Sequence, residues 1–314
     1  PSCLIITVEE EFFYGRRGFA LKVLFIVNPA SGGKDRTGAV TDAVRKVFKA
    51  AAGLFVVKAT KGPGHARALS EEAVKRKFTA VFACGGDGTV NEAAAPLVKS
   101  PLFLGIVPLG KGNTLSRSLK IPAGIEAPLA LMKRGKVRGV DAGLFCDRYF
   151  FAMAGFGLET AFLKKYKKLF FARKAKEFLA RHPGAFKEFL KYGEEELSIT
   201  VDNAFLKINS LTLTAANTEF YGGPAVMAPG ASPFDGNIHL CIIPGVKALK
   251  IPDLSQRLFN GTIGALRGYR HVKGKRIEIK RGHITDCHVD GEPFEWIGDI
   301  TIRVMQKRLR VLTP

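Results

Sequence analysis

Short apolar runs alternate with helix-like stretches through the first half of the chain. The apolar runs are compact and of strand length, as in strands buried on both faces, and they span residues 22–27, 54–58, 79–84 and 103–107. Helical periodicity lies between them, over residues 37–51, 65–77 and 89–99. This βαβα order predicts an α/β domain with a parallel sheet and helices on both of its faces.

The second half has a different pattern, in which strand-like runs dominate. They span residues 137–144, 149–154, 197–201, 205–216, 238–243, 276–280, 283–289 and 300–305. Helical periodicity is clear only over residues 158–192 and is weaker over residues 248–260. Short gaps of hairpin type, such as Asp202-Asn203, predict a mostly antiparallel β-sandwich.

The change of pattern divides the chain into two domains. We predict the α/β domain over residues 21–136 and the β-rich domain over residues 137–307, and we allow residues 308–314 to return to the first domain. The apolar run at residues 4–8 meets three glutamates instead of a long hydrophobic core, which is not typical of a signal peptide. Residues 1–20 are therefore predicted to be an irregular leader.

Composition narrows the class of protein. The 314 residues are 46% hydrophobic and 24% charged, a globular mixture. The five cysteines lie far apart without a Cys-x-x-Cys pair, which argues against a disulfide scaffold or a zinc ribbon and favours a reducing compartment. Since no run of about 18 apolar residues occurs, we expect no transmembrane helix and a cytoplasmic protein.

The charge balance favours an anionic partner. Lys and Arg number 48 against 28 Asp and Glu, a net charge of +20, which suits nucleic acid, phosphate ligands or an acidic membrane surface. Residues 162–192 hold ten Lys or Arg against two Asp or Glu, so this segment alone carries +8. Its apolar residues recur at helical spacing among the lysines, and they are Phe162, Leu163, Tyr166, Leu169 and Phe170.

Two interpretations of this basic segment are open. A basic amphipathic helix suits peripheral association with an anionic membrane surface. A helix that packs its apolar stripe on the domain core and leaves its basic side in solvent has the same pattern. A nucleic-acid partner is not expected, because the stacking aromatics and groove motifs of common RNA-binding modules are not visible in the sequence.

Loops rich in glycine or polar residues follow all four strands of the first half. They span residues 28–33, 60–64, 85–89 and 108–113. Because all four loops follow the carboxyl ends of parallel strands, they converge on one edge of the sheet. Ligands of parallel sheets bind at this edge. Any one of them could be turn chemistry, whereas four together predict a crevice of nucleotide size.

The third loop carries the strongest motif, GGDGTVNE at residues 85–92. Glycine lets backbone N–H groups approach phosphate oxygens that a Cβ atom would keep away, and a helix N-terminus attracts phosphate. Thr89 is expected to cap the helix or contact a phosphate, and Asp87 to orient a metal-bound water or hold a neighbouring loop. A tight turn with an Asp cap is the plainer alternative. The motif is neither a Walker loop nor a dinucleotide fingerprint.

Several motifs in a fixed order resemble one known family. In the first half they are NPxSG from Asn28, GGDGTVNE at residues 85–92 and PLGKGN at residues 108–113. In the second half they are FAMAGFGLE at residues 151–159, Asn217 with YGG at 221–223, DG at 235–236 and DGEP at 290–293. Over roughly residues 22–312 the chain is similar to the catalytic region of the diacylglycerol kinase and sphingosine kinase superfamily.

The resemblance implies an enzyme that transfers the γ-phosphate of ATP to the hydroxyl of a lipid alcohol, diacylglycerol-like as first choice and sphingoid-like as second. It also implies the cofactors ATP and Mg²⁺, a nucleotide-binding first domain and a lipid-substrate second domain. The residues assigned to ATP binding are Asn28, Ser31, Gly32, Thr60, Gly85, Gly86, Asp87, Gly88, Thr89, Val90, Asn91, Lys111, Gly112 and Asn113. Asp87 is also a candidate catalytic residue.

Acidic residues of the second half complete the implied site. Glu292 matches the proton acceptor of the family, and Asp235 matches a metal site that also uses backbone oxygens, here those of Ser232 and Asn237. Asp290 lies two residues from Glu292 and would face the same side of an extended segment. The sequence therefore leaves open which of the two carboxylates is the base.

The fourth loop departs from the family pattern. Bacterial diacylglycerol kinases commonly have PLGTxND there, whereas this chain has Lys111 in place of the hydroxyl residue and Thr114 in place of the acid. Lys111 can contact a phosphate as a point charge. The missing carboxylate leaves open which residues hold magnesium and which lipid is the substrate. An NAD-kinase-like phosphotransferase on a soluble acceptor and a non-catalytic basic lipid- or nucleic-acid-binding protein are the alternatives. A homodimer is left open.

Overall fold

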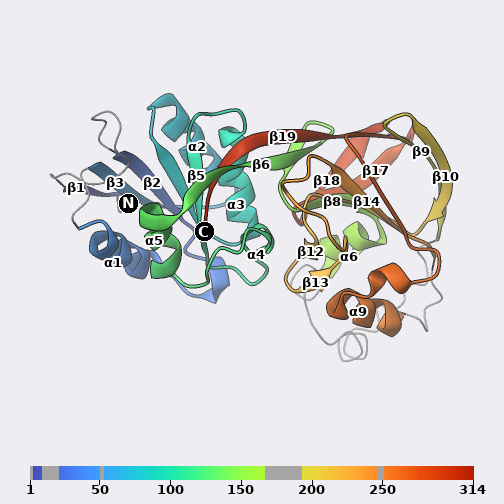
Figure 1. The fold of residues 1–314 in the computed structure, drawn as a ribbon, viewed down its shortest axis with the longest axis horizontal. Coiled ribbons are helices and arrows are strands. Elements are labelled where there is room, and N and C mark those ends of the chain that lie inside the picture. The colour runs from blue at the N-terminus through green and yellow to red at the C-terminus, as the bar shows by residue number, and fades with distance from the viewer. Residues whose placement is uncertain (1–2, 9–20, 50–52, 167–192, 246–250) are drawn as a thin grey trace. The chain divides into compact units, whose positions relative to one another are not determined.

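The computed structural model describes residues 3–8, 21–49, 53–166, 193–245 and 251–314 (Figure 1). The chain divides into an α/β unit, Pro1–Val140 with Lys307–Pro314, and a sandwich unit, Asp141–Gln306. The division falls within β6 (Lys136–Phe145), which leads from the first unit into the second, and β19 (Ile300–Thr313) leads back. The predicted fold class, a mostly parallel α/β domain followed by a β-sandwich domain, is confirmed.

Four parallel strands form the centre of the α/β unit. Their order is β3 (Gly53–Ala59), β2 (Leu21–Val27), β4 (Ala80–Gly85) and β5 (Phe103–Pro108). All residues of β4 and five consecutive residues of β2 are buried, which explains their continuous apolar sequences. The last part of β19 extends the sheet beyond β5, with Val311 paired in parallel to Leu104.

The first strand, β1 (Cys3–Val8), pairs antiparallel with β3 at the edge of this sheet. The prediction that residues 1–20 are an irregular leader is therefore wrong for residues 3–8. The apolar run at residues 4–8 has high β-propensity, and the open edge of β3 offers its backbone groups hydrogen-bonding partners. Residues 9–20 lie outside the described residues.

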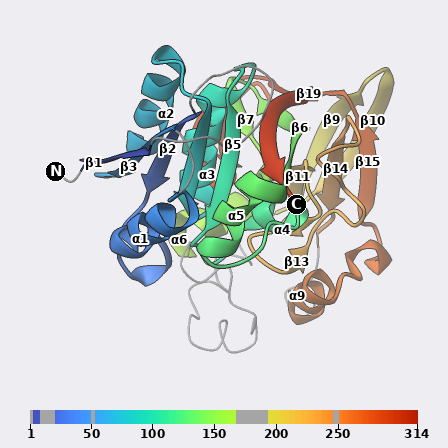
Figure 2. The same ribbon diagram turned by 60° about the vertical axis from the view of Figure 1, so that its left-hand side comes forward.

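Helices cover both faces of the parallel sheet. The three predicted ones are α1 (Thr37–Val47), α2 (His65–Lys75) and α3 (Asp87–Ala94), while α4 (Thr114–Ser118) and α5 (Glu126–Arg134) lie beyond the elements that periodicity indicated. The β2–β3 and β3–β4 connections cross the sheet in opposite directions, so right-handed crossovers place α1 and α2 on opposite faces. Helix α1 packs beside α5 (Figure 2), and α2 packs beside α3.

The sandwich unit consists of two sheets packed face to face. One sheet has the order β15 (Arg270–Gly274), β14 (Ile238–Ile243), β11 (Thr212–Ala216), β8 (Met153–Gly157), β17 (Ile284–Val289) and β18 (Glu292–Ile297). The other contains β10 (Ala204–Ser210), β9 (Glu195–Val201), β16 (Arg276–Lys280) and the first part of β19, with β6 and β7 (Arg148–Phe150) beside it. Side chains from both sheets form one core, among them Phe156, Leu213, Ile199 and Ile277.

The other face of the six-stranded sheet is also covered. A second core there includes Met153, Cys241 and Ile243. Its cover consists of the hairpin of β12 (Phe220–Tyr221) and β13 (Ala225–Val226), helix α9 (Ile251–Asn260) and the 3-10 turn η4 (Ile263–Ala265). Residues on both faces of these strands are therefore apolar, and their sequences do not alternate as those of a half-exposed strand would.

Two predicted strands are each divided in the structure. Residues 205–216 form β10 and β11, which belong to different sheets, and the chain passes between them at Leu211. Residues 149–154 are shared by β7 and β8. The second break has a tertiary cause, because the N–H groups of Phe151 and Ala152 donate to the side chain of Asp290.

The predicted basic helical insertion at residues 158–192 is described only in its first part, helix α6 (Leu158–Tyr166). Leu163 is buried there, and Lys164 Nζ lies 2.5 Å from Asp286 and 3.5 Å from Glu295. The contact with Asp286 raises the pKa of Lys164. Residues 167–192 lie outside the described residues. Within the part of the chain that the structure describes, no helix is long and apolar enough to cross a membrane.

Candidate functional site

Three of the predicted loops meet at the carboxyl edge of the parallel sheet. The N–H of Gly86, after β4, donates to Ser31 Oγ at 3.2 Å, in the 3-10 turn η1 (Ser31–Gly33) after β2. Asn28 Nδ2 donates to Thr89 Oγ1 at 2.9 Å. The N–H of Leu109, after β5, donates to the carbonyl oxygen of Gly85 at 2.9 Å. Side-chain and backbone hydrogen bonds thus join loops 28–33, 85–89 and 108–113 into one surface.

Two glycines allow this close packing. A Cβ atom on Gly110 would lie 2.5 Å from the Cα of Gly86, closer than carbon atoms approach without displacement of the backbone. Gly32 has a φ of +70°, and a Cβ atom there would lie 2.5 Å from the carbonyl oxygen of Leu109. Glycine is therefore required by contact distance at both positions and by conformation at Gly32.

Asp87 holds the neighbouring loop. It is the first residue of α3, and its Oδ1 accepts a hydrogen bond of 2.6 Å from the N–H of Thr114. Asn113, in the left-handed conformation with a φ of +51°, exchanges side-chain hydrogen bonds with the backbone of Gly110 at 3.0 and 2.8 Å. Lys111 lies between these contacts and is exposed. The fourth loop is thus folded onto α3 and presents a lysine to solvent.

The other residues assigned to ATP binding differ in exposure. Thr89 is buried, and its hydroxyl accepts the hydrogen bond from Asn28. Val90 is buried in the core of the α/β unit. Gly86, Asp87, Gly88 and Asn91 are half-buried, and Gly32 is exposed. The half-buried group includes Asp87 and Gly88 at the start of α3, where helical N–H groups have no acceptor within the helix.

Glu92 holds a loop of the candidate site, and the sequence analysis quoted it in a motif without assigning it a role. Its Oε1 accepts from the N–H of Gly64 at 2.9 Å, and its Oε2 accepts from the N–H of Ala66 at 3.2 Å. The carboxylate therefore caps the N-terminus of α2 from the side of α3. It fixes the second loop, which carries Thr60, against the third. The position of Glu92, three residues after Thr89, does not by itself indicate this role. Its hydrogen-bond partners are at the start of α2, which is distant in the sequence.

In the sandwich unit, Asp290 is bonded to the backbone of a distant loop. Its Oδ2 accepts from the N–H of Phe151 and its Oδ1 from those of Ala152 and Met153, each at 2.9 Å. Its own N–H donates to the carbonyl oxygen of Met153 at 2.7 Å. The carboxylate of Asp290 therefore fixes the break between β7 and β8, and its oxygens are already engaged.

Asp290 and Gly291 form a two-residue hairpin turn, because Val289 pairs directly with Glu292. Their φ values are +46° and +81°, as required by a type I′ turn, for which Asp-Gly is a preferred sequence. The expectation that residues 290–292 form one extended segment is therefore wrong. Glu292, the first residue of β18, is exposed, whereas the carboxylate of Asp290 is bonded to the backbone.

The residues assigned to the metal lie in one loop before β14. Asp235 Oδ1 accepts from the N–H of Asn237 at 2.9 Å, and the N–H of Asp235 donates to the carbonyl oxygen of Ser232 at 3.2 Å. Asp235 Oδ2 also lies 2.7 Å from Nε2 of His239, a contact that the sequence analysis did not anticipate. A carboxylate and backbone carbonyls are the oxygen ligands that Mg²⁺ takes, with water completing its shell, so this loop fits the ion chemically.

His239 also contacts a second histidine, with 2.8 Å between its Nδ1 and Nε2 of His271. Burial lowers the pKa of His271, and the nearby His239 and Lys273 lower it further. Two histidine side chains, from β14 and β15, thus lie in a row beside the loop that holds the metal candidates, and His239 is within hydrogen-bonding distance of Asp235.

A buried polar cluster also escaped the sequence analysis. His288 Nε2 lies 2.8 Å from Glu159 Oε1, and Thr214 Oγ1 donates to Glu159 Oε2 at 2.9 Å. All three side chains are buried. Burial, followed by the charge of Glu159, raises the pKa of the neighbouring Tyr221. The cluster joins α6 to β11 and β17, and its His288 lies two residues before Asp290. It therefore fixes the strand that leads into the Asp290-Gly291 turn.

Comparison with known proteins gives matches in both units. Residues 22–145 match the diacylglycerol kinase catalytic domain, and residues 153–313 match the YegS C-terminal NAD kinase beta sandwich-like domain. A protein of Pectobacterium atrosepticum with the name "Probable lipid kinase YegS-like" is 30% identical over 276 residues, which are 86% of this chain and 89% of that protein. A Bacillus subtilis protein with the name "Diacylglycerol kinase" is 28% identical over 285 residues, 85% of this chain and 88% of that protein.

A solved structure has the same architecture. The crystal structure of a diacylglycerol kinase from Bacillus anthracis str. Sterne superposes with a TM-score of 0.70 at 21% sequence identity. The superposition covers 95% of this chain and 98% of that chain. At this identity the similarity establishes a shared fold.

We expect the substitution Asp290→Asn to lower the free energy of unfolding by about 2–3 kcal/mol, because an amide group cannot accept all three backbone hydrogen bonds and leaves buried donors without a partner. The urea midpoint, followed by circular dichroism, measures this change. Glu292→Gln is the matched control, since an exposed substitution changes stability by no more than about 0.5 kcal/mol. Equal midpoints for Asp290→Asn and wild type would contradict the anchoring role.

Proposed function

This chain belongs to the family that joins a diacylglycerol kinase catalytic domain to a YegS-type sandwich domain, and on that premise we propose that it is an ATP-dependent lipid kinase. It transfers the γ-phosphate of ATP to the hydroxyl of a lipid alcohol, diacylglycerol-like as first choice and sphingoid-like as second. The observation that carries the proposal is the joined set of loops 28–33, 85–89 and 108–113 at the carboxyl edge of the parallel sheet.

The joined loops suit the phosphates of a nucleotide. The first turn of α3 offers backbone N–H groups and the positive end of a helix dipole. Lys111, exposed on the adjacent loop, adds a mobile positive charge. Phosphoryl transfer requires mainly that the phosphate is positioned and its charge neutralised, and these are the two properties that the loops provide.

Glu292 and Asp290 have different roles in this proposal. A base must take the proton of the attacking hydroxyl, and the exposed carboxylate of Glu292 is assigned that step. Asp290 is a positioning residue, because its oxygens are bonded to the backbone of residues 151–153. Asp87 likewise positions the fourth loop through Thr114.

Mg²⁺ belongs to the proposal as a cofactor. When bound, it neutralises phosphate charge. Asp235 would hold it with its carboxylate, and Ser232 and Asn237 with backbone oxygens. The contact between Asp235 and His239 competes with the ion for one carboxylate oxygen, so we expect the affinity to depend on this histidine.

The acceptor is identified by a transfer assay. Purified protein is incubated with γ-labelled ATP, Mg²⁺ and diacylglycerol, sphingosine or NAD in separate reactions, and the labelled product is identified by chromatography. The proposal expects label in a lipid phosphate, most strongly with diacylglycerol. Label in NADP alone, or in no acceptor, would overturn it.

Nucleotide binding should depend on the contact between Gly110 and Gly86. Gly110→Ala introduces a Cβ atom 2.5 Å from the Cα of Gly86 and must separate the two loops, so we expect the Kd for ATP to rise at least about tenfold, or ~1.4 kcal/mol. Isothermal titration calorimetry measures it. Gly38→Ala is the control, because a Cβ atom at that position in α1 meets nothing within 4 Å. Unchanged affinity in folded Gly110→Ala would contradict a phosphate role for these loops.

Glu292→Gln should lower kcat on the lipid acceptor by about 10²–10⁴-fold, the usual contribution of a general base, and leave the Kd for ATP unchanged. The amide keeps the size of the side chain but cannot take the proton. Turnover is measured with the labelled-ATP assay at saturating substrate. If Glu292→Gln keeps full turnover while a folded Asp290→Asn loses it, the base is Asp290.

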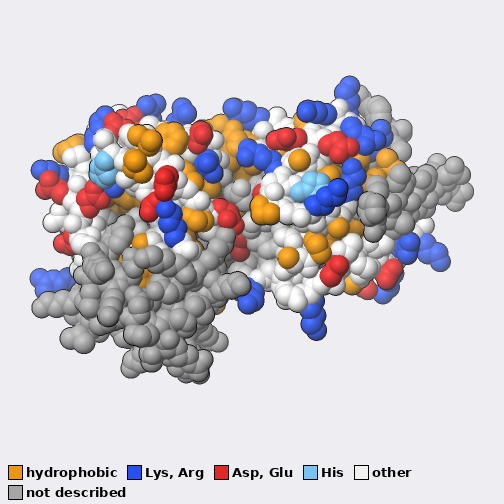
Figure 3. Space-filling view, turned by 180° about the vertical axis from the view of Figure 1, so that it is seen from behind, with side chains coloured by type: hydrophobic (Ala, Val, Ile, Leu, Met, Phe, Trp, Pro, Cys, Tyr) orange, Lys and Arg blue, Asp and Glu red, His pale blue; other side chains and the backbone are white. Residues whose placement is uncertain are grey.

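A lipid acceptor also requires access to a membrane surface, and we propose that the protein binds anionic membranes peripherally from the cytoplasm. On the face drawn in Figure 3, the Lys and Arg side chains of the described residues are interspersed with acidic and apolar ones. The strongest concentration of positive charge in the sequence is the +8 segment 162–192. Lys164 contributes little to docking, since Asp286 and Glu295 already pair with it, and the proposal rests on the lysines that follow.

Replacement of Lys165, Lys167 and Lys168 by Gln should weaken binding to anionic vesicles, because each basic residue near such a surface contributes about 1 kcal/mol. Co-sedimentation with vesicles of phosphatidylglycerol and phosphatidylcholine measures it. Lys75, Lys77 and Lys99 of the α/β unit, replaced together, give a control with the same change in net charge. Added salt should weaken wild-type binding, since charges are screened over about 10 Å at 0.1 M. Equal sedimentation of both triple variants would contradict docking through this segment.

A further inference from the structure

Arg36 is the residue directly before α1, and its side chain folds back over the η1 turn. Its Nη2 lies 3.7 Å from the position that a Cβ atom on Gly32 would take. The same position is 2.5 Å from the carbonyl oxygen of Leu109, so the guanidinium group lies beside the contact between loops 28–33 and 108–113. Arg36 is therefore part of the surface that the joined loops form.

Arg36 is half-buried, yet its guanidinium group has no hydrogen bond or ion pair among the described residues. Asp35 is the acid next to it in the sequence, but Oδ1 of that carboxylate accepts from the N–H and the hydroxyl of Thr37, at 2.8 and 2.6 Å. The hydroxyl, followed by the N–H, lowers the pKa of Asp35. The acid is thus directed at the start of α1, and the donors of Arg36 are left for solvent or a ligand.

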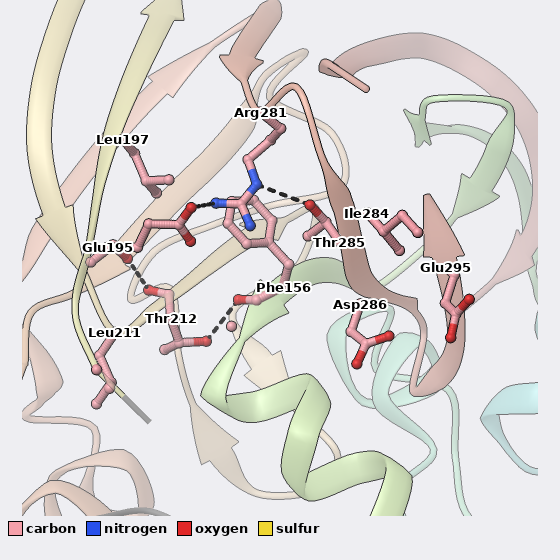
Figure 4. A pocket seen from close by; sticks show the side chains of 13 residues that line it. Phe156, Glu195, Leu197, Leu211, Thr212, Arg281, Ile284, Thr285, Asp286 and Glu295 are labelled. Carbon is pink, nitrogen blue, oxygen red and sulfur yellow. Dashed lines mark hydrogen bonds and ion pairs between the residues drawn. The ribbon is translucent and has the colours of Figure 1, made fainter. Parts of the chain in front are cut away.

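Arg281 in the sandwich unit has the contacts of an arginine that holds a fold together. It lies at a cavity of about 380 Å³, with one guanidinium nitrogen directed at Glu195 and one at Thr285 (Figure 4). Its side chain is 6% exposed, its Nε donates to Thr285 Oγ1 at 2.9 Å, and its Cζ lies 4.9 Å from the ring centroid of Phe156. Arg36 has no such carboxylate, hydroxyl or ring contact within the described part of the chain. A structural role therefore does not account for its position over the glycine turn.

The two loops that meet at Gly32 are positively charged. Residues 28–37 and 108–117 together hold four cations and one acid, a net charge of +3, and these residues are Lys34, Arg36, Lys111, Arg117 and Asp35. Arg117 Nε donates to the carbonyl oxygen of Gly112 at 3.0 Å, which keeps this cation on the fourth loop. Since a surface that is lined by one sign of charge concentrates ligands of the opposite sign, the loops favour an anion.

A phosphate group suits these contacts. A guanidinium group can bind two phosphate oxygens through parallel N–H donors, which the ammonium group of a lysine cannot do. Gly32 has no side chain to fill the space beside the guanidinium group. Ser31, the residue before it, bonds to the N–H of Gly86 directly before α3. Arg36 and the first turn of α3 are thus neighbouring positions for phosphate on one continuous surface.

We infer that Arg36 binds a phosphate group of the nucleotide, as a second anion contact beside the first turn of α3. This role rests on the proposed function, and it makes the affinity depend on the number of phosphates. A monophosphate is held at the first turn of α3 alone. A triphosphate reaches Arg36 as well, so Arg36 selects ATP over AMP.

Isothermal titration calorimetry of the full chain with ATP and AMP tests this role. Arg36→Gln keeps most of the side-chain length but removes the charge and the paired donors. We expect its Kd for ATP to rise at least about tenfold, equivalent to ~1.4 kcal/mol, and its Kd for AMP to change less than about twofold. Arg45→Gln is the matched control, because it removes the same charge from an exposed position of α1, and it should leave both affinities unchanged.

A measurement on the wild type does not depend on how the variants fold. Phenylglyoxal modifies accessible arginines, and peptide mass spectrometry should show that ATP protects Arg36 more than AMP or inorganic phosphate does, while Arg45 reacts equally in all cases. Equal protection of Arg36 by inorganic phosphate and ATP would indicate a general anion site and overturn the role. So would unchanged ATP affinity in Arg36→Gln, or equal losses for ATP and AMP. If wild type binds neither nucleotide, the kinase proposal fails as well, whereas normal ATP binding that is insensitive to Arg36 removes only this assignment.

Discussion

Backbone N–H groups that lack a partner within their own helix or strand must find an acceptor elsewhere. Three acidic side chains supply such acceptors, two in the α/β unit and one in the sandwich unit. Asp87 accepts from Thr114. Glu92 accepts from residues 64 and 66. Asp290 accepts from residues 151–153. In each case the carboxylate and the donor are far apart in sequence, so these bonds fix the loops that the proposed chemistry uses.

This constraint separates acids that hold the structure from acids that can react. A carboxylate whose oxygens are bonded to backbone donors gives up loop structure if it takes a proton or a substrate. Asp290 has that arrangement, while Glu292, two residues later, is at an exposed strand position. The family's DGEP sequence thus combines a turn residue with a carboxylate that faces solvent. The proposed assignment of the base follows from the exposed position of Glu292 and from the three backbone bonds of Asp290, and not from residue type.

The sandwich unit contains two further polar arrangements that apolar strands would not suggest. Glu159 and His288 form a buried pair that fixes β17 to α6. Arg281 connects the two sheets and lines a cavity. The side chains of Glu159, His288 and Arg281 are all buried. Burial raises the pKa of the Cys241 and Cys287 thiols in the same unit to about 12, which keeps them protonated.

The sequence by itself determined the fold class, because apolar periodicity depends only on neighbours along the chain, and it identified the glycine loops because close approach requires particular residues. It also placed Asp290 and Gly291 in a motif. It did not determine that the carboxylate of Asp290 divides a predicted strand at residues 151–153, or that the N–H of Thr114 donates to Asp87. It also did not determine that residues 3–8 pair with β3, or that Arg281 contacts Glu195 and Phe156. Each of these contacts joins residues distant in sequence. Such partners are brought together only by the packing of the whole chain, and local pattern carries no record of them.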